Sequence, residues 1–366
     1  MAASSERADL SGLGSKHAIV MSPVPESNAG GVERFSWLLA GILQEEGWRV
    51  SIVGPTSQPG RWTFRFGGSP LHWSLSAGRA AAAADRAPDL IVGNGFLGLA
   101  APRAVPRVQV FHGTSVGEVL AARRGLLRRD FLRRLVGYWP LEALTCRAGE
   151  LVVVSESAAE ETTSYYRRAP AAIISGGVDT ELFRPRDRGE ARRRLGLDEQ
   201  PRYALFVGRP EYRKGADLLL DSCRGAGWEL LHAGATPIPG ARHLGLLAPE
   251  RLADAYAAAD CLLFPTRYEA CSYVLLEALA CGTPAVTTRV GWTRTLLREL
   301  PRYETLCVHP TVQDIVARLR WLQGADTRPL MEDVRTLVSA RNGLARFRSD
   351  WLALIERVVA PHLRRT

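Results

Sequence analysis

The fold of this chain is decided by residues 202–220, which read RYALFVGRPEYRKGADLLL. Residues 203–207 form a short apolar run, residues 208–215 are polar and contain glycine and proline, and an apolar helical pattern follows. A short apolar run without alternation is typical of a strand that a parallel sheet buries on both faces. The segment therefore predicts a strand, a turn and a helix of a parallel α/β fold.

The same alternation extends over most of the 366 residues. Two consecutive series of strands and helices imply two doubly wound, Rossmann-like domains that face a central cleft. In the first series, apolar runs predict strands at 17–24, 48–55, 88–94, 107–113, 150–156 and 171–177. In the second series, they predict strands at 202–208, 228–234, 242–247, 260–265, 284–288 and 304–310.

We expect the chain to have four parts. Residues 1–16 are small and polar and predict a flexible tail. An N-terminal Rossmann-like domain spans 17–178, and a C-terminal one spans 179–345, which begins with a charged, proline-containing connector. Residues 346–366 predict a C-terminal helix that can pack back on the N-terminal domain.

Composition restricts the class of protein. Hydrophobic residues make up 46% and charged residues 23%, which excludes collagen-like, coiled-coil and wholly disordered chains. The 47 Lys and Arg against 38 Asp and Glu give a net charge of +9, which favours an anionic partner. No C-x-x-C pair occurs among the six cysteines, so they predict buried, reduced thiols rather than a zinc site. Without a signal-peptide core or a stretch of 18 apolar residues, we expect a cytoplasmic protein.

Two cations follow the strand at residues 203–207. Arg209 and Lys214 stand five residues apart at a predicted helix start, where together they can neutralise a diphosphate. Only two of the 47 basic residues are lysines, Lys16 and Lys214, which weakens the interpretation of Lys214 as a solvated surface residue. We therefore predict that Arg209 and Lys214 bind phosphate.

Two other turns follow predicted strands in the first series. Gly30 and Gly31 open a helix, where backbone N–H groups can approach a phosphate, although a simple tight turn explains two glycines better. His112 ends the strand at 107–113, at the sheet edge where ligands of parallel sheets bind. A histidine that is satisfied by loop carbonyls is an equal alternative.

The segment 268–284 contains two glutamates, Glu269 and Glu277, among apolar residues. If it is helical throughout, these carboxylates lie about 12 Å apart, beyond the roughly 5–9.5 Å of glycosidase pairs. Such a pair suits hydroxyl groups at two ends of one extended ligand. Their apolar neighbours predict a buried helix, in which a glutamate needs partners.

Residues 123–139 hold six arginines and one acid. On a helical wheel the apolar residues fill one half and most arginines the other, as in a helix on an anionic membrane surface. An ordinary surface helix packed on its sheet gives the same pattern and is favoured, whereas nucleic acid fits poorly because aromatic residues are not interleaved with the arginines. The candidate membrane or acceptor residues are Arg128, Arg129, Arg133 and Arg134.

Together these features resemble glycosyltransferase family 4, the retaining sugar-nucleotide transferases of the GT-B fold. The resemblance runs in family order from about residue 19 to 291, and its last three segments are highly specific. The matching segments are GGVER, FHGT, VVVSES, IISGGVDTELFRP, LFVGRPEYRKGADLLL and LGLLAPERLADAYAAADCLLFPTRYEACSYVLLEALACGTPAVTT.

The resemblance implies a sugar-nucleotide site in the C-terminal domain and an acceptor site in the N-terminal domain. Arg209 and Lys214 would hold the diphosphate, Glu277 the ribose and Glu269 the donor sugar, and His112 would meet that sugar from across the cleft. Neither a metal ion nor another cofactor is implied. The other donor-binding residues would be Gly30 and Gly31 at the phosphate, Leu246 at the base, and Cys271, Ser272, Tyr273 and Val274 at the sugar. Many members have Gly or Pro where Ser272 stands, which leaves the shape of the sugar pocket open.

The expected activity is transfer of a sugar, with retention, from a nucleoside-diphosphate sugar to an acceptor. The acceptor is either membrane-linked, with the enzyme peripheral at the inner membrane face, or a small natural product. One alternative is a GT-B-fold epimerase or hydrolase, which converts the donor without an acceptor. The other is a non-catalytic protein that binds nucleotide sugars at a membrane surface.

Overall fold

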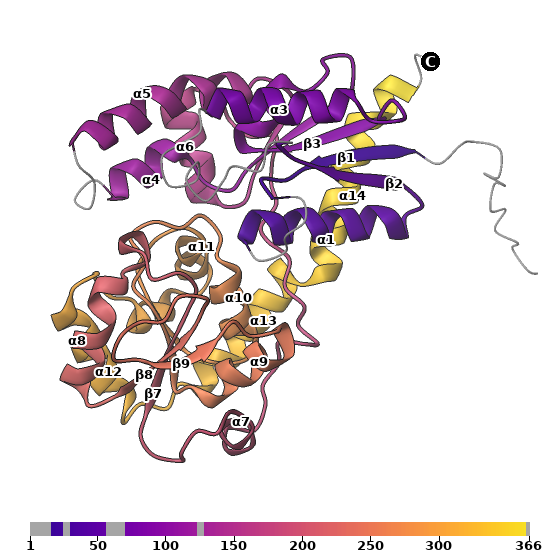
Figure 1. Cartoon of the computed structure of the whole chain (residues 1–366). Coiled ribbons are helices and arrows are strands. Elements are labelled where there is room, and N and C mark those ends of the chain that lie inside the picture. The colour runs from indigo at the N-terminus through magenta and orange to yellow at the C-terminus, as the bar shows by residue number, and fades with distance from the viewer. Residues whose placement is uncertain (1–15, 25–29, 56–69, 123–127, 364–366) are drawn as a thin grey trace, which may run out of the picture. The chain divides into compact units, whose positions relative to one another are not determined.

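A computed structural model describes residues 16–24, 30–55, 70–122 and 128–363 (Figure 1). Nearly all of the predicted tail, residues 1–15, lies outside the described residues. The chain divides into two compact units, one formed by residues 1–108 and 358–366 and the other by residues 109–357. The domain boundary that we expect near residue 178 stays a prediction.

The first unit is built on three parallel strands, with β1 at the centre. Residues Ala18–Met21 pair with Leu90–Gly93 on one side, and His17–Met21 pair with Arg49–Val53 on the other. Two helices cover opposite faces of these strands (Figure 1). The elements are β1 (His17–Met21), α1 (Gly31–Glu45), β2 (Arg49–Val53), α3 (Pro70–Ala82), β3 (Leu90–Asn94) and the 3-10 helix η1 (Gly95–Ala100).

Apolar side chains hold α3 against these strands. Ile19, Met21 and Ile91 are fully buried and pack with Ala77 and Ala81 of the helix. The small alanines let the helix backbone approach the sheet closely, while successive strand residues point to opposite faces. Both faces of β1 are therefore buried, as the unalternating apolar run predicts.

The strand order of the first sheet is β2-β1-β3-β4-β5-β6. All six strands predicted for the first series are confirmed; five end earlier than predicted, whereas β3 ends at Asn94 as predicted and begins two residues later. The remaining elements of this region are β4 (Arg107–Phe111), α4 (Ser115–Ala122), α5 (Arg128–Thr145), β5 (Glu150–Val153), α6 (Glu156–Tyr166) and β6 (Ala172–Ile173).

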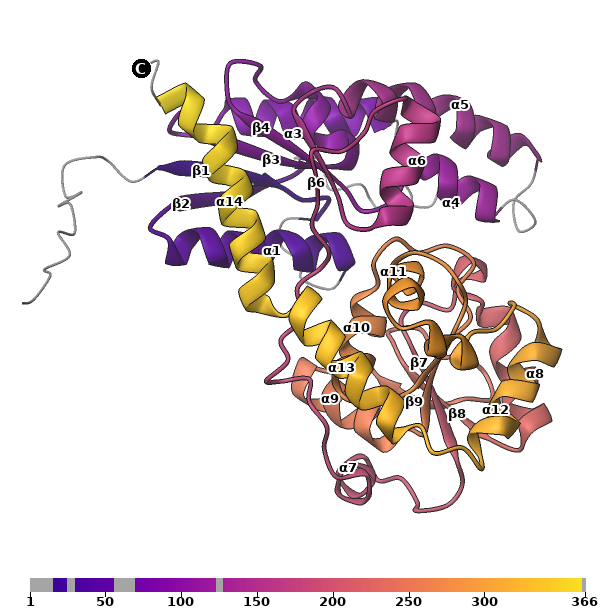
Figure 2. The same ribbon diagram turned by 180° about the vertical axis from the view of Figure 1, so that it is seen from behind.

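A second, five-stranded parallel sheet follows, with the order β11-β10-β7-β8-β9. Helices α8 and α12 pack together on one face, and α9, α10 and α13 on the other (Figure 2). The strands are β7 (Tyr203–Val207), β8 (Glu229–Ala233), β9 (Arg242–Gly245), β10 (Cys261–Phe264) and β11 (Ala285–Thr287). The helices are α8 (Ala216–Ala226), α9 (Pro249–Ala258), α10 (Tyr273–Ala280), α11 (Trp292–Glu299), α12 (Val312–Leu322), α13 (Arg328–Asn342) and α14 (Leu344–Leu363).

One prediction for this region is wrong. Residues 304–310 are not a strand, because the 3-10 helix η4 (Pro301–Leu306) occupies their start and only Cys307 bridges to Thr287. This segment is apolar because Leu306, Cys307 and Val308 are buried, and burial alone does not distinguish a strand from a turn. The connector after residue 178 also contains a helix, α7 (Arg188–Leu195), which Asp187 caps.

Candidate functional site

The two neighbouring strands β7 and β10 are far apart in sequence, so the direction of the chain through the sheet reverses between them. Ligands of open parallel sheets bind at the carboxyl ends of strands beside such a switch point. Arg209 and Lys214 follow β7, and Glu269 follows β10. The fold therefore brings the predicted phosphate-binding and sugar-binding side chains to one edge.

Lys214 lies over the turn that leaves β7. It ends the 3-10 helix η3 (Tyr212–Lys214), and its Nζ stands 3.1 Å from the position that a Cβ would take at Gly208. Gly208 has a φ of +116°, which favours glycine. Burial lowers the pKa of Lys214, while the nearby Glu269 carboxylate opposes this effect. The ammonium group is thus desolvated beside a carboxylate, as expected of a site that receives an anionic ligand.

Arg209 is more open to solvent. Its side chain is 75% exposed, and its Nε lies 3.1 Å from Oε1 of Glu211. Solvent screens an exposed pair of this kind, so Glu211 orients the guanidinium without holding it strongly.

Arg213, which the sequence analysis did not select, organises the loop that carries Glu269. Its Nη1 donates to the Tyr268 carbonyl at 3.0 Å and to Oε2 of Glu269 at 3.3 Å, and its side chain is 18% exposed. Burial opposes its charge, but the carboxylates of Glu269, Glu118 and Glu211 together raise the pKa of Arg213. In the sequence, only its position directly before Lys214 indicated that Arg213 belongs to the site.

The segment 269–277 is not helical throughout. Helix α10 begins at Tyr273, with Ser272 as its N-cap accepting from the backbone N–H of Leu275 at 3.4 Å. Glu269 lies in the preceding loop, so the rise of a helix does not set its distance from Glu277. Ser and Asp side chains favour caps because they accept from the first-turn N–H groups. The premise that residues 269–277 form one helix is therefore wrong, so the expected separation of about 12 Å does not apply. The ligand roles proposed for the two glutamates stay predictions.

The predicted sugar-binding residues surround the start of α10. Cys271 is partly exposed, and burial of its thiol raises the pKa to about 12, so it is not a thiolate nucleophile. Tyr273 packs its ring against Gly176, where a Cβ would stand 3.1 Å from the ring. Val274 is partly buried at the edge of the core.

Glu277 is buried, as its apolar neighbours predict, and it has a partner. The side chain is 1% exposed, and its Oε2 accepts from the Tyr256 hydroxyl at 2.8 Å. A buried carboxylate without such a donor would be strongly destabilising. The role of Glu277 at a ribose stays a prediction.

The residues predicted to meet the donor phosphate and base, Gly30, Gly31 and Leu246, do not lie in the loops after β7 and β10. Gly30 is the N-cap of α1 and belongs to the first unit together with Gly31. The Glu33 carboxylate lies where a Cβ of Gly30 would be, so an acid already stands at this helix start. Leu246 follows β9 and is 75% exposed.

The turn after β4 carries His112, which is partly exposed. Burial lowers the pKa of this imidazole to about 4, so His112 is neutral near pH 7. The following residue, Gly113, has a φ of +118°, and the next, Thr114, donates its backbone N–H to the hydroxyl of Tyr268 at 2.7 Å. Within the unit formed by residues 109–357, the hydrogen bond from Thr114 to Tyr268 therefore connects the turn that carries His112 to the loop that carries Glu269.

A buried acid also caps the helix that follows this turn. Glu142 accepts from the backbone N–H and the hydroxyl of Ser115, the first residue of α4, and from the Tyr166 hydroxyl. Burial raises the pKa of Glu142 to about 7, although these hydrogen bonds favour the ionised form. Glu142 was missed because its partners are far from it in the sequence.

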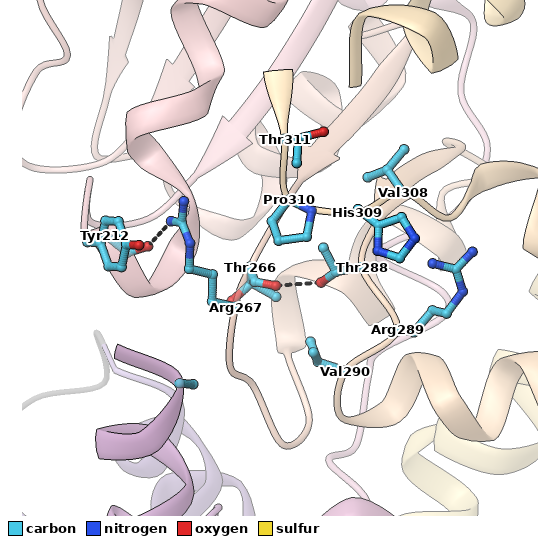
Figure 3. Close-up of a pocket in the computed structure, with 11 residues that line it drawn as sticks. Tyr212, Thr266, Arg267, Thr288, Arg289, Val290, Val308, His309, Pro310 and Thr311 are labelled. Carbon is cyan, nitrogen blue, oxygen red and sulfur yellow. Dashed lines mark hydrogen bonds between the residues drawn. The ribbon is translucent and has the colours of Figure 1, made fainter. Parts of the chain in front are cut away.

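A pocket of about 500 Å³ opens at the carboxyl ends of β10 and β11 (Figure 3). Its two arginines are already neutralised, since Arg267 pairs with Asp217 and stacks on the Tyr212 ring, and Arg289 pairs with Glu304. It contains none of the predicted site residues. Its lining residues are Ala121, Tyr212, Thr266, Arg267, Thr288, Arg289, Val290, Val308, His309, Pro310 and Thr311.

Helix α5 exposes part of its apolar side. Leu132 is 48%, Val136 71% and Trp139 48% exposed, and their spacing places them on one face of the helix. These three side chains are not buried by packing on the sheet, and the favoured interpretation as an ordinary surface helix stays a prediction. The four candidate arginines of this helix lie among residues whose side chains are outside the described part.

The described residues contain neither a membrane-spanning helix nor a metal-binding cluster. None of the helices in the described ranges is long and apolar enough to cross a bilayer. In the same part of the chain, no group of three or more His, Cys, Asp or Glu side chains is arranged to hold a metal ion.

Two family descriptions match most of the chain. Residues 29–182 match the family described as Glycosyltransferase Family 4, and residues 201–323 match Glycosyl transferases group 1. Together the two matches cover the first sheet except β1, the whole second sheet, and the loops that carry Lys214 and Glu269. The chain is therefore a member of glycosyltransferase family 4.

Individual relatives agree over shorter segments. A D-inositol 3-phosphate glycosyltransferase of Segniliparus rotundus is 35% identical over 142 residues, which are 32% of this chain and 32% of that protein. The match thus spans about one third of the relative's length.

Solved structures share the GT-B fold. Sucrose-phosphate synthase from Thermosynechococcus elongatus superimposes with a TM-score of 0.78 at 19% identity, covering 94% of this chain and all of that one. Anabaena HepE, solved in complex with UDP and glucose, gives a TM-score of 0.67 at 15% identity, with 93% and 100% covered.

Proposed function

We propose that this protein is a retaining glycosyltransferase that moves a sugar from a nucleoside-diphosphate donor to an acceptor. The observation that carries the proposal is the placement of Lys214 beside Glu269, with Arg213 holding that glutamate, at the switch point of the second sheet. A cation beside a carboxylate can bind two different parts of the donor: the cation binds the diphosphate, and the carboxylate accepts hydrogen bonds from the sugar hydroxyls.

These residues suit departure of a diphosphate. When the bond between the anomeric carbon and the diphosphate oxygen breaks, negative charge builds on the leaving group and positive charge on the sugar. Lys214, which is buried in place before the reaction begins, would stabilise the leaving group, and the exposed Arg209 would add its charge. Glu269 would accept from sugar hydroxyls, and the acceptor oxygen would bond to the same face of the sugar while its proton leaves with the diphosphate.

A thermal-shift series identifies the donor. The protein is melted with UDP, GDP, ADP or TDP and with their common sugar conjugates, beginning with UDP-glucose because HepE holds UDP and glucose. At 100 times the dissociation constant, we expect a stabilisation of about 2.7 kcal/mol by one nucleotide, which increases with one attached sugar. The shift should be lost in Glu277→Ala. If no nucleotide shifts the melting point, and Glu277→Ala melts like the wild type, the donor site is absent.

The same samples separate the alternative activities. An epimerase or hydrolase converts the nucleotide sugar with no acceptor present, whereas a transferase needs the acceptor for stoichiometric release of the nucleotide. A binding protein shows the thermal shift and no turnover with any acceptor. Treatment with EDTA should leave transfer unchanged, because we expect no metal ion to take part.

The first acceptor to test is D-inositol 3-phosphate, since a relative in the same family is named for it. Formation of a glycosyl-inositol phosphate would identify a small, soluble acceptor. No product with this compound, but product with a natural-product aglycone or a lipid-linked sugar, would place the acceptor in one of the other two classes.

A membrane-surface acceptor has one structural observation in its favour, the exposed apolar row Leu132, Val136 and Trp139 on α5. The helix that carries these side chains also contains arginines in its sequence, a combination that suits anionic lipid headgroups and the acyl boundary beneath them. We infer that this helix docks on a bilayer of anionic phospholipid.

Sedimentation with vesicles tests this docking. At low salt the protein should pellet with phosphatidylglycerol-containing vesicles and not with phosphatidylcholine alone. Arg129→Glu with Arg133→Glu should abolish pelleting and Val136→Ser should reduce it, whereas Trp321→Ser, which changes an exposed tryptophan on α12, should have no effect. Equal pelleting of the charge-reversed variant would make α5 a purely structural helix.

A further inference from the structure

Tyr268 connects two loops that the proposed reaction needs at a fixed distance. It lies between β10 and α10, directly before Glu269. Its carbonyl oxygen accepts from Nη1 of Arg213 and from the Thr266 hydroxyl, both at 3.0 Å. The same guanidinium also donates to Glu269, so Arg213 fixes the backbone of residue 268 and the side chain of residue 269 relative to each other.

The other end of Tyr268 reaches the turn after β4. Its hydroxyl accepts from the backbone N–H of Thr114 at 2.7 Å and lies 2.8 Å from Oε2 of Glu161. The Thr114 hydroxyl donates to the same carboxylate oxygen at 2.6 Å. The Thr114 carbonyl oxygen is a second acceptor, 3.0 Å from the same hydroxyl. With Glu161 ionised, the phenol donates to this closer and charged acceptor and accepts from the Thr114 N–H, so both of its hydrogen-bonding functions are used.

The turn is shaped to admit this phenol. At Gly113 a Cβ would stand 2.8 Å from the Tyr268 hydroxyl and 3.5 Å from the Cβ of Ala270, and the φ of +118° independently favours glycine. A larger residue would push away the side chain that fixes the turn. His112 is the residue before this glycine, so the contact lies one position from the histidine predicted to meet the donor sugar.

We propose that Tyr268 is a positioning residue, which sets the distance between His112 and Glu269 so that both face the same donor sugar. The hydrogen-bonded path runs from Thr114 through the phenol to the main chain of residue 268, and from there through Arg213 to Glu269. Thr114 and Tyr268 are 154 positions apart in the sequence. The two residues lie in different elements, so their distance depends on contacts between the loops, namely the phenol and the 3.8 Å ion pair of Arg213 with Glu118 of α4. The proposal rests on the proposed function, since it needs a donor sugar between the two residues.

Tyr268→Phe tests the role, because it keeps the ring and removes only the hydroxyl. The matched control is Tyr303→Phe, which removes a buried hydroxyl that donates to the Ala285 carbonyl at 2.9 Å in the same sheet. With the nucleotide identified by thermal shift, we expect Tyr268→Phe to bind the nucleoside diphosphate within twofold of the wild type. Its kcat should fall by about 10- to 100-fold, the loss expected from two or three hydrogen bonds, one of them to a charged group.

A measurement that needs no donor completes the test. Hydrogen exchange at the Thr114 amide should become at least tenfold faster in Tyr268→Phe, because this N–H loses its acceptor, and should stay unchanged in Tyr303→Phe. If Tyr268→Phe does not fold, Glu161→Gln, which leaves the phenol in place and removes the charge it donates to, should give the same pattern of weakened kcat and preserved nucleotide binding.

The outcomes separate this proposal from the proposed function. An unchanged kcat in an active Tyr268→Phe enzyme, or a loss of nucleotide binding as large as the loss of kcat, overturns the positioning role. Faster exchange at Thr114 in a protein that binds no nucleotide means that the contact exists but the proposed function has failed, and the positioning role falls with it.

Discussion

Burial acts at the carboxyl ends of both β7 and β4, but after β7 neighbouring carboxylates oppose it and favour the charged forms of the cations, whereas after β4 it moves the ionisable groups towards their neutral forms. Lys214 and Arg213 stand among the carboxylates Glu211 and Glu269. His112 and Glu142, near the other strand, have pKa values of about 4 and about 7. A site that must hold a diphosphate benefits from permanent charge, while the second region contributes shape and hydrogen bonds. The first region should therefore respond to salt and the second to pH.

The largest effect should come from removing the buried cation. Lys214→Ala should lower kcat by about 10²–10³, the scale of losing one group that stabilises charge in the transition state. Steady-state kinetics with the identified donor give the value. Lys16→Ala changes the only other lysine, whose Nζ lies over the Trp48 ring, and should leave kcat within twofold. Equal rates for the two variants would remove Lys214 from the site.

The next effect is the pH dependence of the free energy of unfolding that Glu142, the buried cap of α4, produces. The pKa of Glu142 is about 7 in the folded protein and 4.5 as its ordinary value, so the native state keeps a proton that the unfolded chain releases. The contribution of Glu142 to stability should therefore fall as pH rises from about 4.5 to about 7, by up to about 3 kcal/mol, and then level off. His112, whose pKa is lowered to about 4, contributes in the opposite direction over part of this range. Glu142→Gln lacks only the first contribution, so the difference in stability between the wild type and this variant should become less favourable to the wild type as pH rises.

Urea unfolding at pH 5 and pH 8 measures the difference. Glu229→Gln, at the exposed start of β8, provides the control and should follow the wild-type profile. A Glu142→Gln protein that loses as much stability as the wild type between these pH values would contradict the assignment.

The smallest effect should come from the exposed cation. Arg209→Ala should weaken binding of the donor nucleotide by about tenfold at low salt, because a side chain that is 75% exposed acts through screened charge. In 0.5 M salt the variant and the wild type should approach each other, which calorimetry at both salt concentrations would detect. A salt-independent loss would mean that Arg209 makes a desolvated contact with the nucleotide.

The sequence predicts the framework well, because strands of buried parallel sheets are visible as unbroken apolar runs. Eleven of the twelve predicted strands exist, and the run at 304–310 is the exception, since a buried 3-10 turn is equally apolar. Motif residues such as Lys214 and Glu269 could be selected because they follow strands that the pattern locates.

The supporting residues could not be predicted in this way. Tyr268, Glu142 and Glu161 act through partners that lie tens of residues away, and no local pattern records such pairs. The predicted helical spacing between Glu269 and Glu277 was wrong for a related reason. Helix α10 begins only after its N-cap, Ser272, so Glu269 lies in the loop before the helix. Local patterns locate strands and their following loops, but the contacts between loops depend on tertiary structure.

The scarcity of lysine gives this protein two natural reporters. Reductive methylation with ¹³C-formaldehyde would label the ε-amines of Lys16 and Lys214 and the amino terminus, so the side chains would give just two resonances. Because burial lowers the pKa of Lys214, its resonance should titrate at a lower pH than that of an ordinary lysine and move back towards the ordinary range when a diphosphate binds beside it. Occupancy of the proposed donor site could then be followed by NMR in the unmutated protein.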